Sequence, residues 1–438
     1  MSALREDLQA GKEHFLEAVK GHHQGLNGAA SGWAHDLRLK GLKEFEAAGL
    51  PTSKLEGWRY TSLKSAGLTK FKVIEPADLS GVDLDQRGIP SGDAPRVVLN
   101  NGVFDPAASR LSGVSEGVVI TSLDDAILNH PELVEGCLGR HVDIHSEAFA
   151  ALNTAFLGAG VLIYVPRGLV VDKPIHLLAL NSDGGVYHPL SIVILEENSE
   201  ATLYESYCGT GDGEYLNNGV TEFHLGPNAR LKNIRFQDEN PKACHLASVV
   251  VRQERSSTFS SHLVSLGGGI ARTHFEATVN GEGADCQLRG LYYLDDRRHA
   301  DVHILMDHAK PHCTSHQHFK GVLDDKSTSV FDAKVLVRED AQKTDAIQRN
   351  NNLLLSKNAQ ANVRPQLEIY ADDVKCAHGA TVGQLDENQI FYLRSRGLDL
   401  DSARRELVYA FANEIFNTIS DASTRAFLEA AVRRRLQR

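Results

Sequence analysis

Two residues near the end of the chain, Cys376 and His378, place a thiol and an imidazole two positions apart in the segment ADDVKCAHGATVG at 371–383. On an extended strand both side chains would point to the same face, about 7 Å apart along the strand. A thiolate and a neutral imidazole suit iron or an iron–sulfur centre. Two such ligands are too few for a cluster, so a partner protein would have to complete a cluster site here. The alternative is that the pair serves only the structure.

A second group of candidate ligands, rich in histidine, lies at 299–318. His and Cys are the favoured ligands of zinc, iron and copper. The spacing matches no standard zinc motif, so the group predicts either a metal or interface role or a set of structural and surface histidines. On a strand, its last two histidines would share one face. The members are His299, His303, His308, His312, Cys313, His316 and His318.

The sequence contains no motif for an independent nucleotide or hydrolase site. The three glycines at 267–269 lack the Lys-Ser/Thr that completes a phosphate-binding loop. The spaced glycines of CGTGDGEY at 208–215 follow a β-rich run and open no helix, so we interpret them as a turn. GVSEG at 113–117 has the GxSxG spacing, but no β run leads into it as a hydrolase nucleophile requires, and HExxH is absent. We therefore expect that the chain is not an enzyme and binds no nucleotide itself.

Composition limits the classes of partner and compartment. The 438 residues are enough for two or three domains, and the net charge of −11 argues against nucleic acid as the main partner. The polar start MSALREDLQAGKEH and the lack of any stretch approaching about 18 apolar residues argue against a signal peptide and a membrane span. Six cysteines without a CxxC motif fit a reducing compartment. We expect a cytoplasmic protein.

The candidate ligands all fall within a long β-rich region at 160–385. Short β runs such as VLIYV, SIVIL and LASVVV alternate there with polar turns that resemble one another. Aligning the turns at Ala201, Ala229, Ser257 and Ala284 gives spacings of 28, 28 and 27 residues. A repeat of 20–50 residues is typical of a solenoid, whose stacked units bury a continuous core. We predict a mainly β protein with a β-helix core, and a β-sandwich is the alternative.

Helical patterns flank this core in an N-terminal region at 1–159 and a C-terminal region at 386–438. Asp386 with Gln389 resembles a capping box, and Gly397 fits a helix stop. The C-terminal helices are expected to cover an open end of the solenoid, to dock a partner, or both. Their apolar residues include Leu393, Leu407, Phe411 and Ile415.

Three stretches are similar to the SufD family of the SUF iron–sulfur cluster assembly system. YADDVKCAHGATVGQLDENQIFYLRSRGL at 370–398 resembles the family's signature stretch, and so does RNNNLLLSKNAQANVRPQLEIY at 349–370. KLEGWRYTSL at 54–63 resembles its N-terminal motif. The similarity is most specific over about 345–415. The related SufB family shares the β core but lacks the ADDVKC-x-HGATVG form, so we prefer SufD.

The resemblance implies a right-handed parallel β-helix and a scaffold role in iron–sulfur cluster assembly. The implied partners are SufB and the ABC-type ATPase SufC, which would bind the nucleotide. Cys376 and His378 fall on the family's Cys and His at the SufB interface, where a transient cluster forms and iron enters. The resemblance also implies that the helices at about 386–419 carry the SufC docking surface. The residues expected on that surface are Leu393, Leu407, Phe411 and Ile415.

Two other functions remain open at the level of the sequence. A carbohydrate-active β-helix enzyme would use clustered acids such as Asp372 and Asp373, or the histidine-rich stretch at 299–318. The absence of a secretion signal argues against it. A free-standing metal-binding protein would use the His and Cys residues of the same stretch without any partner.

Overall fold

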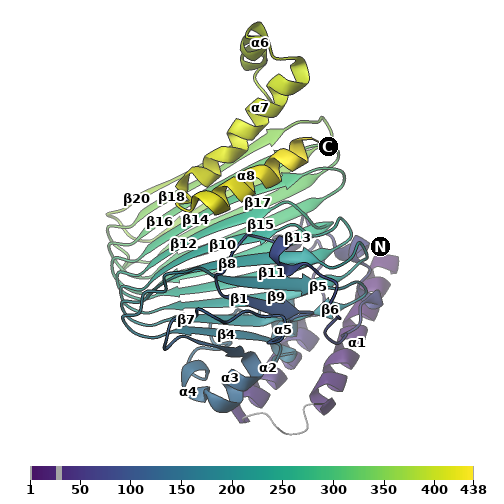
Figure 1. The fold of residues 1–438 in the computed structure, drawn as a ribbon, viewed down its shortest axis with the longest axis vertical. Coiled ribbons are helices and arrows are strands. Elements are labelled where there is room, and N and C mark those ends of the chain that lie inside the picture. Colours follow the sequence, from purple (N-terminus) through teal and green to yellow (C-terminus); the bar gives the residue numbers. More distant parts are fainter. Residues whose placement is uncertain (1, 26–31, 438) are drawn as a thin grey trace.

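The computed structural model describes residues 2–25 and 32–437 of the chain. Its centre is a parallel β-solenoid of about 8 turns, with helices at the N- and C-terminal ends (Figure 1). Strands outweigh helices in this structure. The fold class predicted from the sequence is therefore confirmed.

Each turn of the solenoid adds one strand to each of two sheets, which we call sheet I and sheet II. Neighbouring strands are parallel, except for the antiparallel pairs β1–β2 and β3–β4. Sheet I runs in the order β2 (Val103–Phe104), β1 (Arg96–Asn100), β5 (Ile175–Asn181), β8 (Glu200–Gly209), β10 (Arg230–Gln237), β12 (Thr258–Ser265), β14 (Asp285–Leu294), β16 (Thr314–Leu323), β18 (Asp345–Leu354) and β20 (Lys375–Gly383). Sheet II runs in the order β19 (Gln360–Ile369), β17 (Thr328–Val337), β15 (His299–His308), β13 (Ile270–Val279), β11 (Cys244–Gln253), β9 (Leu216–Leu225), β7 (Leu190–Leu195), β4 (Gly160–Val165) and β3 (Val119–Ser122), with β6 (Val186–Tyr187) paired to β9.

Successive coils place a residue with left-handed backbone conformation at the same position of the turn. Asn228, Ser256 and Gly283 adopt φ angles of 57°, 56° and 71°. Asn and Gly tolerate this region best, because a Cβ atom crowds the backbone there. Each of the three residues stands directly before one of the turn positions aligned in the sequence. The similarity of the polar turns therefore reflects a shared backbone conformation.

The strand register tests the predicted repeat length. Arg230 pairs with Thr258, which confirms one predicted step of 28 residues. The first predicted match, Ala201 with Ala229, is wrong, because Ala201 pairs with Leu231. That turn is two residues longer, since the CGTGDGEY stretch lengthens the path from β8 to β9.

The N-terminal helices cover the outer face of sheet II. Phe15 and Leu152 belong to one buried cluster with Leu162 and Leu246 from that sheet. The region at 1–159 also supplies β1, β2 and β3, so the sheets begin before the region predicted as the core. The boundaries predicted at 159/160 and 385/386 stay predictions. The helices are α1 (Ser2–Gly25), α2 (Gly32–Ala48), α3 (Leu123–Asn129), α4 (Pro131–Val134) and α5 (Ala148–Ala155), with the 3₁₀ turns η1 (Glu56–Trp58), η2 (Leu63–Ala66), η3 (Leu68–Lys70) and η4 (Leu84–Gln86).

The C-terminal helices cover the outer face of sheet I. Val408, Phe416 and Leu428 are buried in one cluster with Ile234 and Leu291 of the sheet. In the part of the chain that the structure describes, no helix is long and apolar enough to cross a membrane. The C-terminal elements are α6 (Glu387–Ser395), α7 (Leu400–Asn413), the 3₁₀ helix η5 (Glu414–Thr418) and α8 (Ala422–Leu436).

Helix α6, the loop after it and the first residue of α7, which together we call the arm (387–400), extend beyond the last strands of the solenoid (Figure 1). The Asp386 side chain caps α6 by accepting from the backbone N–H of Asn388 at 2.8 Å. Gly397, with φ of 100°, follows the helix. The predicted helix start and stop are therefore both confirmed.

Candidate functional site

The C-terminal end of the solenoid has two edge strands, β20 in sheet I and β19 in sheet II. In residues 2–25 and 32–437, no strand pairs with their outer edges. Apolar side chains on these strands are unusually accessible: Ile369 is 40 % exposed and Val382 is 49 % exposed. An edge strand presents unpaired N–H and C=O groups that can pair with another chain. This end of the solenoid is therefore suited to receive a partner through both backbone and side chains.

Strand β20 places the predicted site residues on the interior face of this open end. Cys376 pairs in register with Ala346, and His378 pairs with Gln348. Ala346 and Gln348 are buried inside the solenoid, at 0 % and 1 % exposed. Side chains at paired positions of parallel strands lie on the same face of the sheet, so Cys376 and His378 both lie on the interior face. That they share a face was predicted from the sequence. Because β20 is the last strand of sheet I, they form the final layer of the interior.

The two side chains differ in their accessibility. Cys376 is half-buried and packs against the interior core, whereas His378 is exposed. Burial raises the pKa of the Cys376 thiol, and the nearby charge of Asp345 raises it further against the opposing hydrogen bond from the Ala346 backbone. The thiol is therefore protonated at neutral pH, and a bound metal ion would have to displace its proton.

No group of three His, Cys, Asp or Glu side chains is arranged to hold a metal ion anywhere in the described part of the chain. At the open end the chain contributes one thiol and one imidazole from β20. Asp373, an acid considered for a carbohydrate-active site, lies in the loop before this strand and forms an ion pair with Lys343.

The histidine-rich stretch at 299–318 is divided between two sheets. His299 and His303 lie on the outer face of sheet II, where Thr61 Oγ1 lies 2.7 Å from His299 Nε2 and Asp301 Oδ1 lies 2.9 Å from His303 Nε2. His316 and His318 share the outer face of sheet I, as predicted for a strand. The group is therefore not one cluster.

The remaining members of this stretch contact the protein itself. His308 Nε2 lies 2.8 Å from Ser315 Oγ inside the solenoid. His312 occupies a turn position with φ of 59°, and the Cys313 thiol donates to the Gly281 carbonyl at 3.2 Å. Each of these side chains has a structural place in its coil.

The N-terminal motif at 54–63 lies across the outer face of sheet II, next to the open end. Trp58 is 6 % exposed, and the Arg272 guanidinium lies over its ring at 4.2 Å. Thr61 donates to Asp301, and Glu56 forms an ion pair with Arg364 of β19. A cleft of about 350 Å³ remains between the motif and β15, β17 and β19. The resemblance singled out this motif, but no sequence pattern indicated what it packs against.

The residues predicted for docking lie at different depths on the C-terminal helices. Ile415 is 1 % exposed, and the Phe411 ring lies 4.3 Å from the Lys320 amine on sheet I. Leu393 and Leu407 are half-buried. Their role in docking stays a prediction.

The arm exposes apolar residues that the sequence reasoning did not select. Phe391 is 74 % exposed, Tyr392 is 57 % exposed, and Leu400 is 37 % exposed. Large exposed apolar side chains that lie close together are typical of interaction surfaces. The sequence pattern of α6 does not indicate that Phe391 and Tyr392 are exposed. A helical pattern shows which residues are apolar, but α6 projects from the body and has little to pack against.

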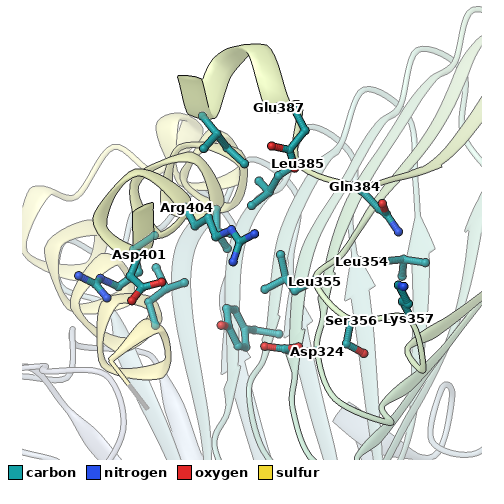
Figure 2. A pocket seen from close by; sticks show the side chains of 15 residues that line it. Asp324, Leu354, Leu355, Ser356, Lys357, Gln384, Leu385, Glu387, Asp401 and Arg404 are labelled. Atoms are coloured by element: carbon teal, nitrogen blue, oxygen red, sulfur yellow. The ribbon is translucent and has the colours of Figure 1, made fainter. Parts of the chain in front are cut away.

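A cavity of about 440 Å³ lies between α7, the base of the arm and the last turns of sheet I (Figure 2). Leu355 and Leu385 line it together with charged side chains such as Asp324, Glu387 and Arg404. The junction between arm and solenoid is thus partly hollow. The arm is held chiefly through its continuity with α7 and through Ile390, which is 3 % exposed.

Comparison with known proteins identifies similar sequences along almost the whole chain. A family model described as "SUF system FeS cluster assembly, SufBD core domain" matches residues 178–411, and one described as "SufBD protein N-terminal region" matches residues 10–177. An iron–sulfur cluster assembly SufBD family protein of Synechocystis sp. is 32 % identical over 394 residues, covering 87 % of each chain. SufD of Escherichia coli is 31 % identical over 420 residues, covering 92 % of this chain and 96 % of that protein. SufD of Bacillus subtilis is 23 % identical over 440 aligned positions, covering 97 % and 98 %.

Proposed function

This chain belongs to the SufBD family of iron–sulfur cluster assembly proteins, and from that premise we propose that it is the SufD-type scaffold subunit of an assembly complex. The resemblance found in the sequence is confirmed at the level of the family. A cytoplasmic location, a scaffold rather than enzymatic role, and the partners SufB and SufC are parts of the proposal. All six cysteines are free, which suits a reducing compartment.

The proposed SufB contact uses the open end of the solenoid. A second β-helix of the same family presents its own edge strands, and two such ends pair strand to strand. The unpaired edges of β19 and β20, with Ile369 and Val382 accessible beside them, support this mode. Pairing covers the last interior layer, including Cys376 and His378, and removes both from water.

The proposed chemistry at this seam is the coordination of an iron–sulfur cluster that the complex builds and releases as its product. The imidazole of His378 accepts incoming iron or ligates the nascent cluster. The Cys376 thiol, whose pKa is raised, releases its proton when it meets the metal. SufB supplies the remaining ligands.

The proposed SufC contact uses the C-terminal helices. SufC binds ATP, and two SufC subunits, one on this chain and one on SufB, close on each other. The closure moves the C-terminal helices and shifts the seam between the two solenoids, which opens it to iron and sulfide. This requires ATP to bind the closed state better than the open state. The exposed aromatic residues of the arm and the hollow junction in Figure 2 support the proposal.

One observation carries the proposal: Cys376 and His378 form the final interior layer of a solenoid whose end is open. The test is His378→Ala in the complex co-expressed with SufB and SufC and purified without oxygen. We expect normal assembly and a loss of the cluster absorption bands. His145→Ala, which also removes an exposed histidine, is the control. Normal cluster yield with normal assembly in the His378 variant would reject the role given to this residue.

A further inference from the structure

Two buried glutamines are stacked beneath His378 inside the solenoid. Gln317 of β16 pairs with Gln348 of β18, and Gln348 pairs with His378 of β20. Both glutamines are 1 % exposed. The three side chains therefore form one column on the interior face of sheet I, and His378 is its outermost member. Below Gln317 the column continues with the apolar Leu288.

The hydrogen bond between the two glutamines runs from Gln348 to Gln317. Gln348 Nε2 donates to Gln317 Oε1 at 3.1 Å. Gln348 Oε1 is buried and accepts no hydrogen bond, and Gln317 Nε2 is buried and donates none. A buried acceptor without a donor is unfavourable, and stacked amides in adjacent strands normally continue as a ladder. The position that continues this ladder toward the open end is occupied by His378.

Other amides in the same layer have their partners within the solenoid. Asn350 Nδ2 lies 3.1 Å from Tyr292 Oη, and Asn350 Oδ1 accepts from Asn352 Nδ2. Among the buried amides of β18, the one whose acceptor has no partner is therefore the one beneath His378. Among the described residues, His378 makes no side-chain hydrogen bond of its own, so a ring N–H of its imidazole is available as the missing donor.

We infer that Gln348 is a positioning residue for His378 and that its Oε1 accepts the N–H of one imidazole nitrogen while the other nitrogen faces iron. This inference rests on the proposed function of His378. A histidine that binds a metal ion commonly donates its second N–H to a fixed acceptor, which selects the tautomer and orients the ring. Because Gln348 is held by Gln317 and by its burial, it supplies such an acceptor before iron arrives.

The amide suits this position better than a carboxylate. A buried Asp or Glu would bring a charge into the interior at a large desolvation cost. Gln348 fixes the ring without this cost.

The test compares three substitutions in the complex with SufB and SufC, and it measures the rate at which a chelator removes the assembled cluster. Gln348→Met keeps the length of the side chain but removes the acceptor, and we expect cluster loss about 10–100-fold faster, the usual effect of removing such a partner. Gln348→Glu keeps an acceptor, and the Gln317 amide can turn its own Nε2–H toward it, so we expect slower loss than with Met. Gln9→Met, at an exposed glutamine on α1 away from the open end, is the matched control and should leave the rate unchanged.

The Glu variant separates positioning from a structural role. If Gln348 only stabilised the interior, a buried carboxylate would be more harmful than methionine, so cluster retention better with Glu than with Met supports the inference. A structural role would predict the reverse order, which would overturn it. The double variant Gln348→Met with His378→Ala should lose the cluster no faster than His378→Ala alone, because the two side chains act as one unit.

The remaining outcomes distinguish the two proposals. Wild-type cluster retention in Gln348→Met, with strong loss in His378→Ala, would overturn this inference and leave the proposed function intact. Normal retention in His378→Ala would reject the proposed function of His378 first. If Gln348→Met prevents assembly of the complex, Gln348→Asn replaces it: the amide is kept but its reach is shortened, and unchanged retention there would equally overturn the inference.

Discussion

The guanidinium of Arg272 lies over the ring of Trp58 at 4.2 Å, and this contact fastens the segment 54–63 to the outer face of sheet II. The Trp58 ring also packs against Phe149 of α5, with 5.7 Å between the ring centroids. Arg272 in turn forms an ion pair with Asp301, which is 1 % exposed. One aromatic side chain thus joins the N-terminal helices to strand β13 of sheet II.

Replacing Trp58 with Ala should lower the free energy of unfolding by about 3–5 kcal/mol, since the change removes a buried aromatic ring and uncovers a buried arginine. Urea denaturation of the full chain measures the effect. Tyr60→Ala, in the same segment but at a side chain that is 51 % exposed, should change stability by about 0.5 kcal/mol or less. Equal effects of the two substitutions would show that the Trp58 contact contributes little.

Local patterns explain what the sequence predicted correctly. The repeated turn depends on single residues with positive φ, such as Asn228 and Ser256, and polar residues of this kind are visible in the sequence. The shared face of Cys376 and His378 follows from strand alternation alone. Both properties depend on neighbouring residues within one strand or turn, and for this reason they needed no knowledge of distant contacts.

Contacts between distant segments could not be predicted in the same way. Arg272 donates to the carbonyl of Gly57, which is 215 positions away in the chain, and neither residue belongs to a periodic pattern that indicates the other. Helical spacing identified Phe411 and Ile415 as one apolar stripe, but spacing does not show what a stripe packs against. The structure places both against sheet I, and it leaves Phe391 of the arm exposed.

Cys376 should react slowly with iodoacetamide at pH 7 in the folded chain, compared with the same residue in urea. Burial, reinforced by Asp345, raises the pKa of its thiol, and only the thiolate is the nucleophile. The labelling rate should therefore increase as the pH rises above 9. Mass spectrometry of labelled peptides follows the reaction. Labelling at pH 7 that is as fast as in urea would contradict this description of the site.

Buried neutral histidines should make the chain less stable in mild acid. His176 is 1 % exposed, and burial, together with the charge of Arg96, lowers its pKa to about 3. An unfolded histidine has a pKa near 6.5, so between about pH 6.5 and pH 3 the unfolded chain binds more protons and stability falls as the pH falls. Burial lowers the pKa of three further histidines in the same direction, to about 3 for His188 and His262 and to about 4 for His308.

Between its folded and unfolded pKa values, each such histidine lowers the free energy of unfolding by about 1.4 kcal/mol for each unit that the pH falls. Urea denaturation at several pH values between 7.5 and 5 measures the total slope. His176→Gln should reduce the slope, while His145→Gln, at a side chain that is 66 % exposed, should leave it as in the wild type. An unchanged slope in the His176 variant would show that this histidine is protonated in the folded state.

Phe391 on the arm should be required for binding of SufC, the partner proposed above. The side chain is 74 % exposed, so Phe391→Glu should alter the free energy of unfolding by about 0.5 kcal/mol or less. A charge in the centre of an apolar contact should nevertheless abolish co-purification of SufC. The experiment co-expresses the variant with SufB and SufC and measures the amount of SufC retained. Leu128→Glu, which places the same charge at an apolar side chain that is 51 % exposed on α3, is the control. Full retention of SufC by Phe391→Glu would move the docking surface from the arm to the side of α7 and α8, where Leu407 remains half-buried and accessible to a partner.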